Sequence, residues 1–222
     1  MSSWLTKQKS IIVTYRTDGE YSLAIGFLTK KISDIQHTYR SFLERYRAYV
    51  VSERLSAFTD LQQYLRNYLV EKKHHDYTQL STGSFETYKY DKTDILLLSV
   101  IATQSRITLT QLAQQLSLSV TATKNRLQTV RKANVIVAYR ALITYHLLGK
   151  EYYKVDVIVN EYDIVPGLKE FVQQHPNILF RNITIGGNDF EFDAEFSSQQ
   201  EFYEMINTIK NLFPEQIRSY TY

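Results

Sequence analysis

The chain has 222 residues, of which 44% are hydrophobic and 22% charged, a composition typical of globular proteins that excludes disorder as the main state. The absence of cysteine excludes disulfide bonds, thiolate metal sites and cysteine nucleophiles. The main apolar run, residues 95–102, is too short to span a bilayer, and the first residues lack a signal-peptide pattern, so we expect a cytoplasmic protein.

The first segment, residues 1–87, carries 12 basic and 9 acidic side chains. Alternating apolar residues on either side of Asp18-Gly19-Glu20 predict a hairpin, and further strand and helix patterns follow it. The predicted elements are strands at 11–17 and 21–28, a helix at 33–49, a strand at 50–59 and an additional helix at 60–70.

Residues 71–90 have the composition of a polar linker. Within it, His74, His75 and Asp76 could bind a metal, and a solvated loop explains them equally well. We expect no metal site and no cofactor.

The middle segment, residues 88–150, carries 9 basic and 2 acidic side chains, and no acidic residue occurs between 95 and 150. Helical spacing of apolar residues predicts a first helix over 91–103. Thr108 and Gln111 match a capping box for a short second helix, and Ser119 is a favourable N-cap for a third, over 120–133. Two short strands, at 135–137 and 141–144, complete a predicted winged helix-turn-helix. The inward residues of the first helix are predicted to be Ile95, Leu98, Ile101 and Ala102.

The third helix of this segment has side chains that suit DNA. Its first turns carry small polar and methyl groups for base edges, and its basic side chains can neutralise phosphates. Two alternatives remain open, a solvated basic helix and a winged helix that binds protein. The predicted DNA-binding residues are Ser119, Thr121, Ala122, Lys124, Asn125, Arg126, Gln128, Arg131 and Lys132.

The last segment, residues 151–222, carries 5 basic and 12 acidic side chains. Its strand and helix patterns follow the order βαββαβ, which predicts an α+β fold of the ferredoxin-like type, a sheet with two helices on one face. The predicted elements are a strand at 152–160, a helix at 162–175, strands at 178–185 and 189–196, a helix at 199–212 and a strand at 217–222.

Four carboxylates alternate along one of these strands and therefore share one face of it. A metal site or an acid–base pair is conceivable there. Salt bridges are the alternative, with Lys154 and Arg181 on adjacent strands offsetting the charge. No hydrolase or nucleotide-binding motif occurs, and we expect no catalytic residues and no enzyme. The four carboxylates are Asp189, Glu191, Asp193 and Glu195.

An internal repeat relates the two ends of the chain. Setting Gly19 against Gly186 also aligns Leu23 with Phe190, so the first segment resembles a partial ββαβ copy of the last. We expect the two to pack together. The predicted parts are a partial ferredoxin-like domain at 1–70, a linker at 71–90, a winged helix-turn-helix at 91–150 and a ferredoxin-like domain at 151–222.

The middle segment contains a series of short motifs in a distinctive order. They are Asp91-Lys92-Thr93-Asp94-Ile95, Ser105-Arg106, Leu112-Ala113, Leu118-Ser119, Arg126-Leu127, Asn134-Val135-Ile136 and Tyr139. With these motifs the segment resembles the winged helix-turn-helix of the leucine-responsive/asparagine regulator (Lrp/AsnC) family, and the βαββαβ unit is similar to that family's effector-binding and oligomerisation domain. The resemblance covers residues 88–222 as one complete unit, with a half unit over 8–70, as in a tandem member whose first unit is truncated.

The resemblance implies a transcription regulator that contacts double-stranded DNA through the helix beginning at Ser119. It also implies homo-dimers or higher oligomers through the ferredoxin-like domains. An amino acid or other small effector would bind near the turn formed by Gly186, Gly187, Asn188 and Asp189. The alternative is a truncated paralogue that acts as a protein-interaction module and modulates full-length family members.

Overall fold

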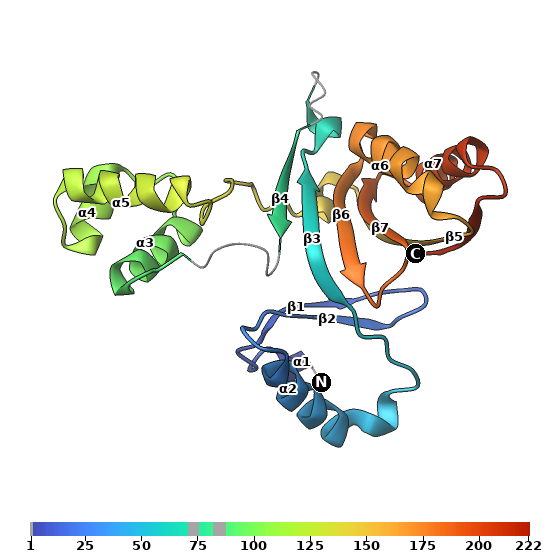
Figure 1. Ribbon diagram of the computed structural model, residues 1–222, viewed down its shortest axis with the longest axis horizontal. Helices are drawn as coiled ribbons and strands as arrows, with labels where there is room; N and C mark the ends of the chain where they lie inside the picture. The colour runs from blue at the N-terminus through green and yellow to red at the C-terminus, as the bar shows by residue number, and fades with distance from the viewer. Residues whose placement is uncertain (1, 71–75, 82–87) are drawn as a thin grey trace.

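A lobe of three helices stands beside a six-stranded antiparallel sheet, and the N-terminal elements lie below one end of that sheet in Figure 1. The computed structural model describes residues 2–70, 76–81 and 88–222. None of the helices within these ranges has the length and hydropathy needed to cross a membrane. Helices and an antiparallel sheet together make the fold α+β, as the sequence predicts.

The N-terminal elements form a small unit of their own. The ring of Trp4 lies 6.1 Å from that of Phe42 and 6.0 Å from that of Tyr46, which packs the first helix on the second. The predicted hairpin and helix are confirmed. The elements are α1 (Ser2–Leu5), β1 (Ile11–Arg16), β2 (Leu23–Phe27), α2 (Ile32–Tyr46) and a 3-10 turn at Arg47–Tyr49.

Two predictions for the following residues are wrong. The segment predicted as a strand and a helix over 50–70 contains instead β3 (Ala57–Tyr64) and a 3-10 turn at Asn67–Leu69, and the predicted linker contains β4 (Tyr77–Ser81). β3 pairs with β4 on one side and with a C-terminal strand on the other. Ladder hydrogen bonds on both edges outweigh the weak helical preference of this short stretch.

The main sheet has the strand order β4-β3-β6-β7-β5-β8, so β3 and β4 extend the predicted ferredoxin-like sheet. Both helices of the βαββαβ unit pack on one face of it, over a core that includes Val155, Phe192 and Phe202. All six predicted elements of this unit are present. They are β5 (Glu151–Val159), α6 (Val165–Gln174), β6 (Ile178–Ile185), β7 (Phe190–Phe196), α7 (Gln199–Leu212) and β8 (Ile217–Thr221).

The helical lobe comprises α3 (Lys92–Thr103), α4 (Leu109–Leu116) and α5 (Val120–Lys132). The predicted inward face of α3 is only partly right, because Ile95 is 52% exposed while Leu97 and Val100 are buried. The face is turned by Asp94, a buried carboxylate that closes the capping box with Asp91. The wing strands predicted at 135–137 and 141–144 are not formed within residues 133–144, which carry no strand.

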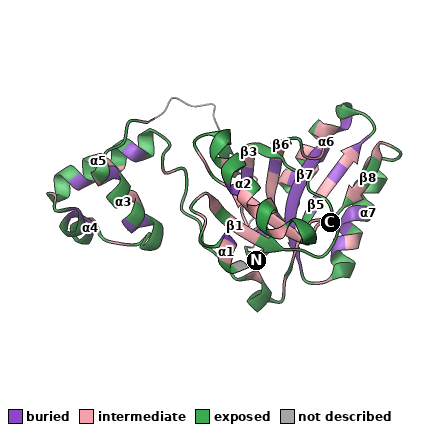
Figure 2. Ribbon diagram, turned by 90° about the horizontal axis from the view of Figure 1, so that it is seen from below, coloured by how far each residue is buried: buried purple, intermediate pink, exposed green. Residues whose placement is uncertain are grey.

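The N-terminal unit contacts the main sheet, as expected for the two ends of the chain. Figure 2 shows α2 and β1 in front of the sheet when the molecule is seen from below. A Cβ on Gly19 would lie 2.3 Å from the backbone carbonyl oxygen of Tyr222, and one on Gly186 would lie 2.9 Å from that of Leu55. The backbones approach too closely for any other residue at these points, so the contacts depend on the two glycines.

Gly186→Ala is expected to destabilise the chain more than Gly149→Ala. Both glycines have positive φ, +80° and +65°, so both substitutions carry a backbone strain of about 1–2 kcal/mol. Only Gly186 has a backbone atom in the way, whereas nothing lies within 4 Å of a Cβ on Gly149. Urea denaturation of the two variants measures the difference, and equal midpoints would show that the contact with Leu55 contributes nothing.

Candidate nucleic-acid interface

The helix-turn-helix is built from two capped helices and a three-residue turn. The Thr108 hydroxyl accepts from the backbone N–H of Gln111, whose side chain accepts from the N–H of Thr108 in return. Ser117 ends α4 in the left-handed conformation, with φ 55°. The Ser119 hydroxyl then accepts from the N–H of Ala122, 3.2 Å away, and begins α5. The predicted caps are confirmed, and they fix the angle between the two helices.

One side of α5 is held in the lobe's core. Thr123 and Val130 are fully buried, and Leu127 packs against the same cluster. The Thr123 hydroxyl donates to the backbone carbonyl of Ser119, 3.0 Å away, so this inward polar group is satisfied. The opposite side of α5 is therefore not needed for packing and faces solvent.

Most of the predicted DNA-binding residues lie on this outward side. Within the described part of the lobe, the guanidinium of Arg131 donates to the hydroxyl of Tyr139 over 3.0 Å and lies 5.5 Å from the centre of its ring. Tyr139 was not predicted as a site residue; its position two residues after the predicted wing strand was the available signal. The predicted residues that are exposed are Ser119, Thr121, Ala122, Lys124, Asn125, Gln128, Arg131 and Lys132.

Arg126 differs from the other predicted contacts because it points inward. Its guanidinium donates to Asp94 over 2.7 Å and to Asp91 over 2.9 Å, which joins α5 to the start of α3. The Asp94 side chain is only 3% exposed, so this pair is partly desolvated. A hydrogen bond from the Asp94 backbone N–H, together with Arg126, holds the pKa of Asp91 below its usual value. Arg126 therefore positions α5 against α3, and its guanidinium is engaged by two carboxylates of the protein.

Arg106 and several glutamines line a groove on α4 that was not predicted. The groove has a volume of about 330 Å³ and lies where α3 passes into α4. Arg106 stands two residues before the N-cap of α4 and is exposed. Amide and guanidinium groups suit phosphate and sugar contacts beside a recognition helix. The lining residues are Gln104, Arg106, Ile107, Gln111, Gln114 and Gln115.

The turn predicted to bind an effector is internally satisfied. The backbone N–H of Asn188 donates to the Glu191 carboxylate over 2.9 Å. Asp189 accepts from the backbone N–H of Val159 and from the hydroxyl of Tyr162, at 2.9 and 2.8 Å. A Cβ on Gly187 would lie 2.1 Å from the Glu191 carboxylate, so the glycine leaves room for that side chain.

Two of the four carboxylates, Glu191 and Glu195, form salt bridges, which is the alternative that the sequence left open. Glu195 has no exposed surface and receives both ends of the Arg66 guanidinium at 3.0 Å, as well as the hydroxyl of Tyr68. Glu191 accepts from Lys154 over 2.9 Å. Within the described ranges, no group of three metal-ligating side chains is present. His74 and His75 lie outside the described residues.

Arg181 does not offset these charges as predicted. It pairs opposite Phe192, so it points to the helix-covered face, whereas its neighbour Asn182 pairs opposite Glu191 on the carboxylate face. The guanidinium lies 5.2 Å from the centre of the Phe190 ring and donates to Gln62. The register of β6 therefore separates Arg181 from the carboxylates.

Among the residues that the structure describes, Asp193 has hydrogen-bond partners but no cation in direct contact. The Tyr152 hydroxyl donates to it over 3.0 Å, and the Asn182 amide lies 3.4 Å away. Burial raises the pKa of Asp193 to about 6, although Lys154 nearby opposes the shift. The folded chain therefore binds this proton more tightly than the unfolded chain does.

We expect Asp193→Asn to flatten the pH dependence of stability between about pH 4 and 6. Because the folded pKa is raised, the wild-type chain loses stability as pH rises through this window, by at most about 3 kcal/mol. Glu191→Gln is the control of opposite sign. Burial alone would raise the pKa of Glu191, but Lys154 and the hydrogen bonds from Asn188 and Thr184 bring it below its usual value, so this variant loses stability at neutral pH. Thermal unfolding at pH 4 to 8 tests both, and an unchanged profile for Asp193→Asn would contradict the assignment.

Arg126→Lys is expected to destabilise the helical lobe by about 1–3 kcal/mol. The Arg126 Nη1 donates to both Asp91 and Asp94, and the shorter lysine side chain, with its more strongly hydrated ammonium, compensates the buried Asp94 less well. Lys124 lies two residues before Arg126 on the exposed side of α5. Lys124→Gln is the matched control and should leave stability unchanged. Circular dichroism at increasing temperature measures the melting temperature of each variant. Equal melting temperatures for the two variants would show that Arg126 does not position α5.

The comparisons with known proteins agree with this geometry. The family described as winged helix-turn-helix DNA-binding matches residues 90–137. No curated protein sequence matches the chain.

Solved structures share the fold over about three-fifths of the chain. A transcriptional regulator from Neisseria meningitidis in complex with L-Met is 21% identical, with TM-score 0.52 over 60% of this chain and 86% of its own. AsnC from E. coli is 17% identical, with TM-score 0.52 over 61% and 91%. An AsnC family regulator from Agrobacterium tumefaciens is 17% identical, with TM-score 0.52 over 59% and 86%. The chain thus resembles the Lrp/AsnC regulators, with a winged helix-turn-helix joined to a domain of their fold.

Proposed function

We propose that the chain is a sequence-specific regulator of transcription that binds double-stranded DNA with α5 in the major groove. The observation that carries this proposal is the outward face of α5, exposed and basic, in a stretch from 95 to 150 without an acidic residue. The match of residues 90–137 to the winged helix-turn-helix DNA-binding family supports it. Such a regulator would act in the cytoplasm, in contact with the cell's DNA.

The distribution of charge supports the same orientation on DNA. Lys124, Arg131 and Lys132 are exposed on α5 and can neutralise phosphates on either side of the groove. Residues 151–222 carry 12 acidic against 5 basic side chains. Repulsion from phosphates would keep this acidic domain away from the duplex and leave α5 as the contacting element.

Symmetric DNA sites require two recognition helices, and each chain has one α5. We therefore propose that two or more copies bind together through their ferredoxin-like domains, with half-sites about one helical turn apart. A small effector such as an amino acid would act on this assembly near Gly186, Gly187, Asn188 and Asp189. The L-Met complex of the Neisseria regulator supports that class of ligand. An effector carboxylate at Asn188 would have to displace Glu191, which holds that N–H here.

Lys124→Ala and Arg131→Ala are each expected to weaken duplex binding and to reduce the slope of log K against log salt by about 0.9, the effect of one lost phosphate contact. Fluorescence anisotropy with a labelled duplex from 50 to 200 mM salt measures the slopes. Lys210→Ala on α7 makes the same charge change outside the lobe and should leave the slope unchanged. Absence of duplex binding at low salt would refute the proposal and favour the protein-interaction module.

A further inference from the structure

The outward face of α5 carries amide and methyl groups in one stripe. Thr121, Asn125 and Gln128 are spaced by four and three residues, which places them on the same side of the helix. All three are exposed, and Ala122 is exposed beside them. The N-terminal part of a recognition helix is the part that contacts base edges; Thr121, Ala122 and Asn125 lie in the first two turns of α5, and Gln128 follows at the start of the third.

No arginine side chain of the first two turns of α5 lies in this stripe, because Arg126 is bound by two carboxylates. Arg126 is the one arginine in the first two turns of α5, and its guanidinium is bound to Asp91 and Asp94 on α3. The other arginine of the helix, Arg131, lies in the last turn against Tyr139. Lys124, about 60° from Thr121 at 100° per residue, lies at one edge of the exposed side, and its ammonium can neutralise a phosphate.

The chemistry of these groups selects particular bases. An asparagine or glutamine amide matches adenine N7 and N6 with two hydrogen bonds, and a threonine or alanine methyl group suits the thymine methyl. Guanine is read mainly by arginine or lysine. Asn125 and Gln128 are separated by about 4.5 Å along the helix, close to the spacing of about 3.4 Å between neighbouring base pairs.

We infer that α5 reads two neighbouring A·T base pairs through Asn125 and Gln128, with the methyl groups of Thr121 and Ala122 on the adjoining thymines. This inference rests on the proposed function. It assigns Arg126 to positioning, and Lys124, Arg131 and Lys132 to phosphates without base preference.

Selection of duplexes from a randomised pool by the full chain tests the assignment. The selected sites should contain two adjacent A·T pairs per half-site. Asn125→Ala should lose the preference at one of them and Gln128→Ala at the other, each with about 10-fold weaker binding to the selected site and little change on non-specific DNA. Asn125→Arg should change its position from A·T to G·C, because arginine matches guanine O6 and N7.

Lys124→Ala is the matched control, with uniformly weaker binding and unchanged base preference. Binding that selects G·C pairs, or that loses affinity uniformly in Asn125→Ala, overturns the inference and leaves DNA binding intact. Failure to bind any duplex at low salt overturns the proposed function and the inference together. Circular dichroism of each variant confirms that α5 is folded, so a lost preference reports base reading.

Discussion

Burial of carboxylates along one face of β7 is the constraint on which the sheet domain depends. An ionised group removed from water must be paired or must take up a proton, because its unpaired burial costs several kcal/mol. Glu195 is paired with Arg66 and Tyr68, whereas Asp193 accepts hydrogen bonds from Tyr152 and Asn182 and has a raised pKa. Arg66 and Tyr68, which follow β3, are therefore linked to the C-terminal domain through the buried carboxylate of Glu195.

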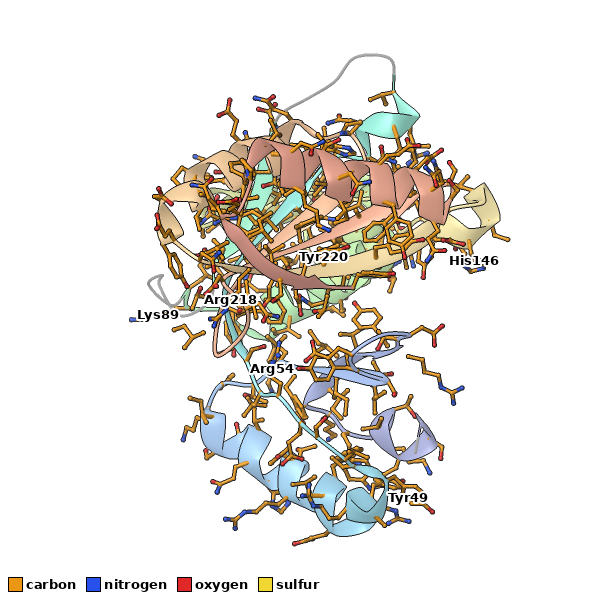
Figure 3. The ribbon with its side chains drawn as sticks, turned by 90° about the vertical axis from the view of Figure 1, so that its right-hand side faces the viewer. Tyr49, Arg54, Lys89, His146, Arg218 and Tyr220 are labelled. Atoms are coloured by element: carbon orange, nitrogen blue, oxygen red, sulfur yellow. The ribbon has the colours of Figure 1, made fainter. Side chains whose placement is uncertain are left out.

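A similar arrangement governs the helical lobe. The only acidic residues of segment 88–150 are Asp91 and Asp94, and both bind Arg126. The single positive charge of Arg126 thereby compensates the two carboxylates in part, and the remaining basic side chains of α5 face outward. Figure 3 shows Arg54 between the N-terminal unit and the sheet domain; its guanidinium lies 3.2 Å from Glu20 and 5.2 Å from the centre of the Tyr21 ring, both in the turn between β1 and β2.

Sequence patterns predicted the helices and strands that local rules determine. The caps at Thr108 and Ser119 and the alternation in β7 depend on neighbours a few residues apart, and these predictions are confirmed. β3 and β4 could not be predicted in the same way, because β3 depends on pairing with β6, more than 100 residues away, and β4 in turn pairs with β3. The roles of Arg126 and Arg181 were missed for a related reason. Whether a basic side chain points outward depends on the rotation of a helix or the register of a strand, which tertiary contacts decide.

The helical lobe is inserted into the sheet domain, since β4 precedes it, β5 follows it, and both strands belong to one sheet (Figure 1). Lys30 contacts Tyr90 at the entry to the lobe, and Arg140 contacts Thr78 of β4 on the way out. A body attached at two points has fewer orientations than one on a single tether. In the proposed complex with DNA, the lobe would therefore lose less rotational entropy on docking, and any shift within the sheet would act on both attachments at once.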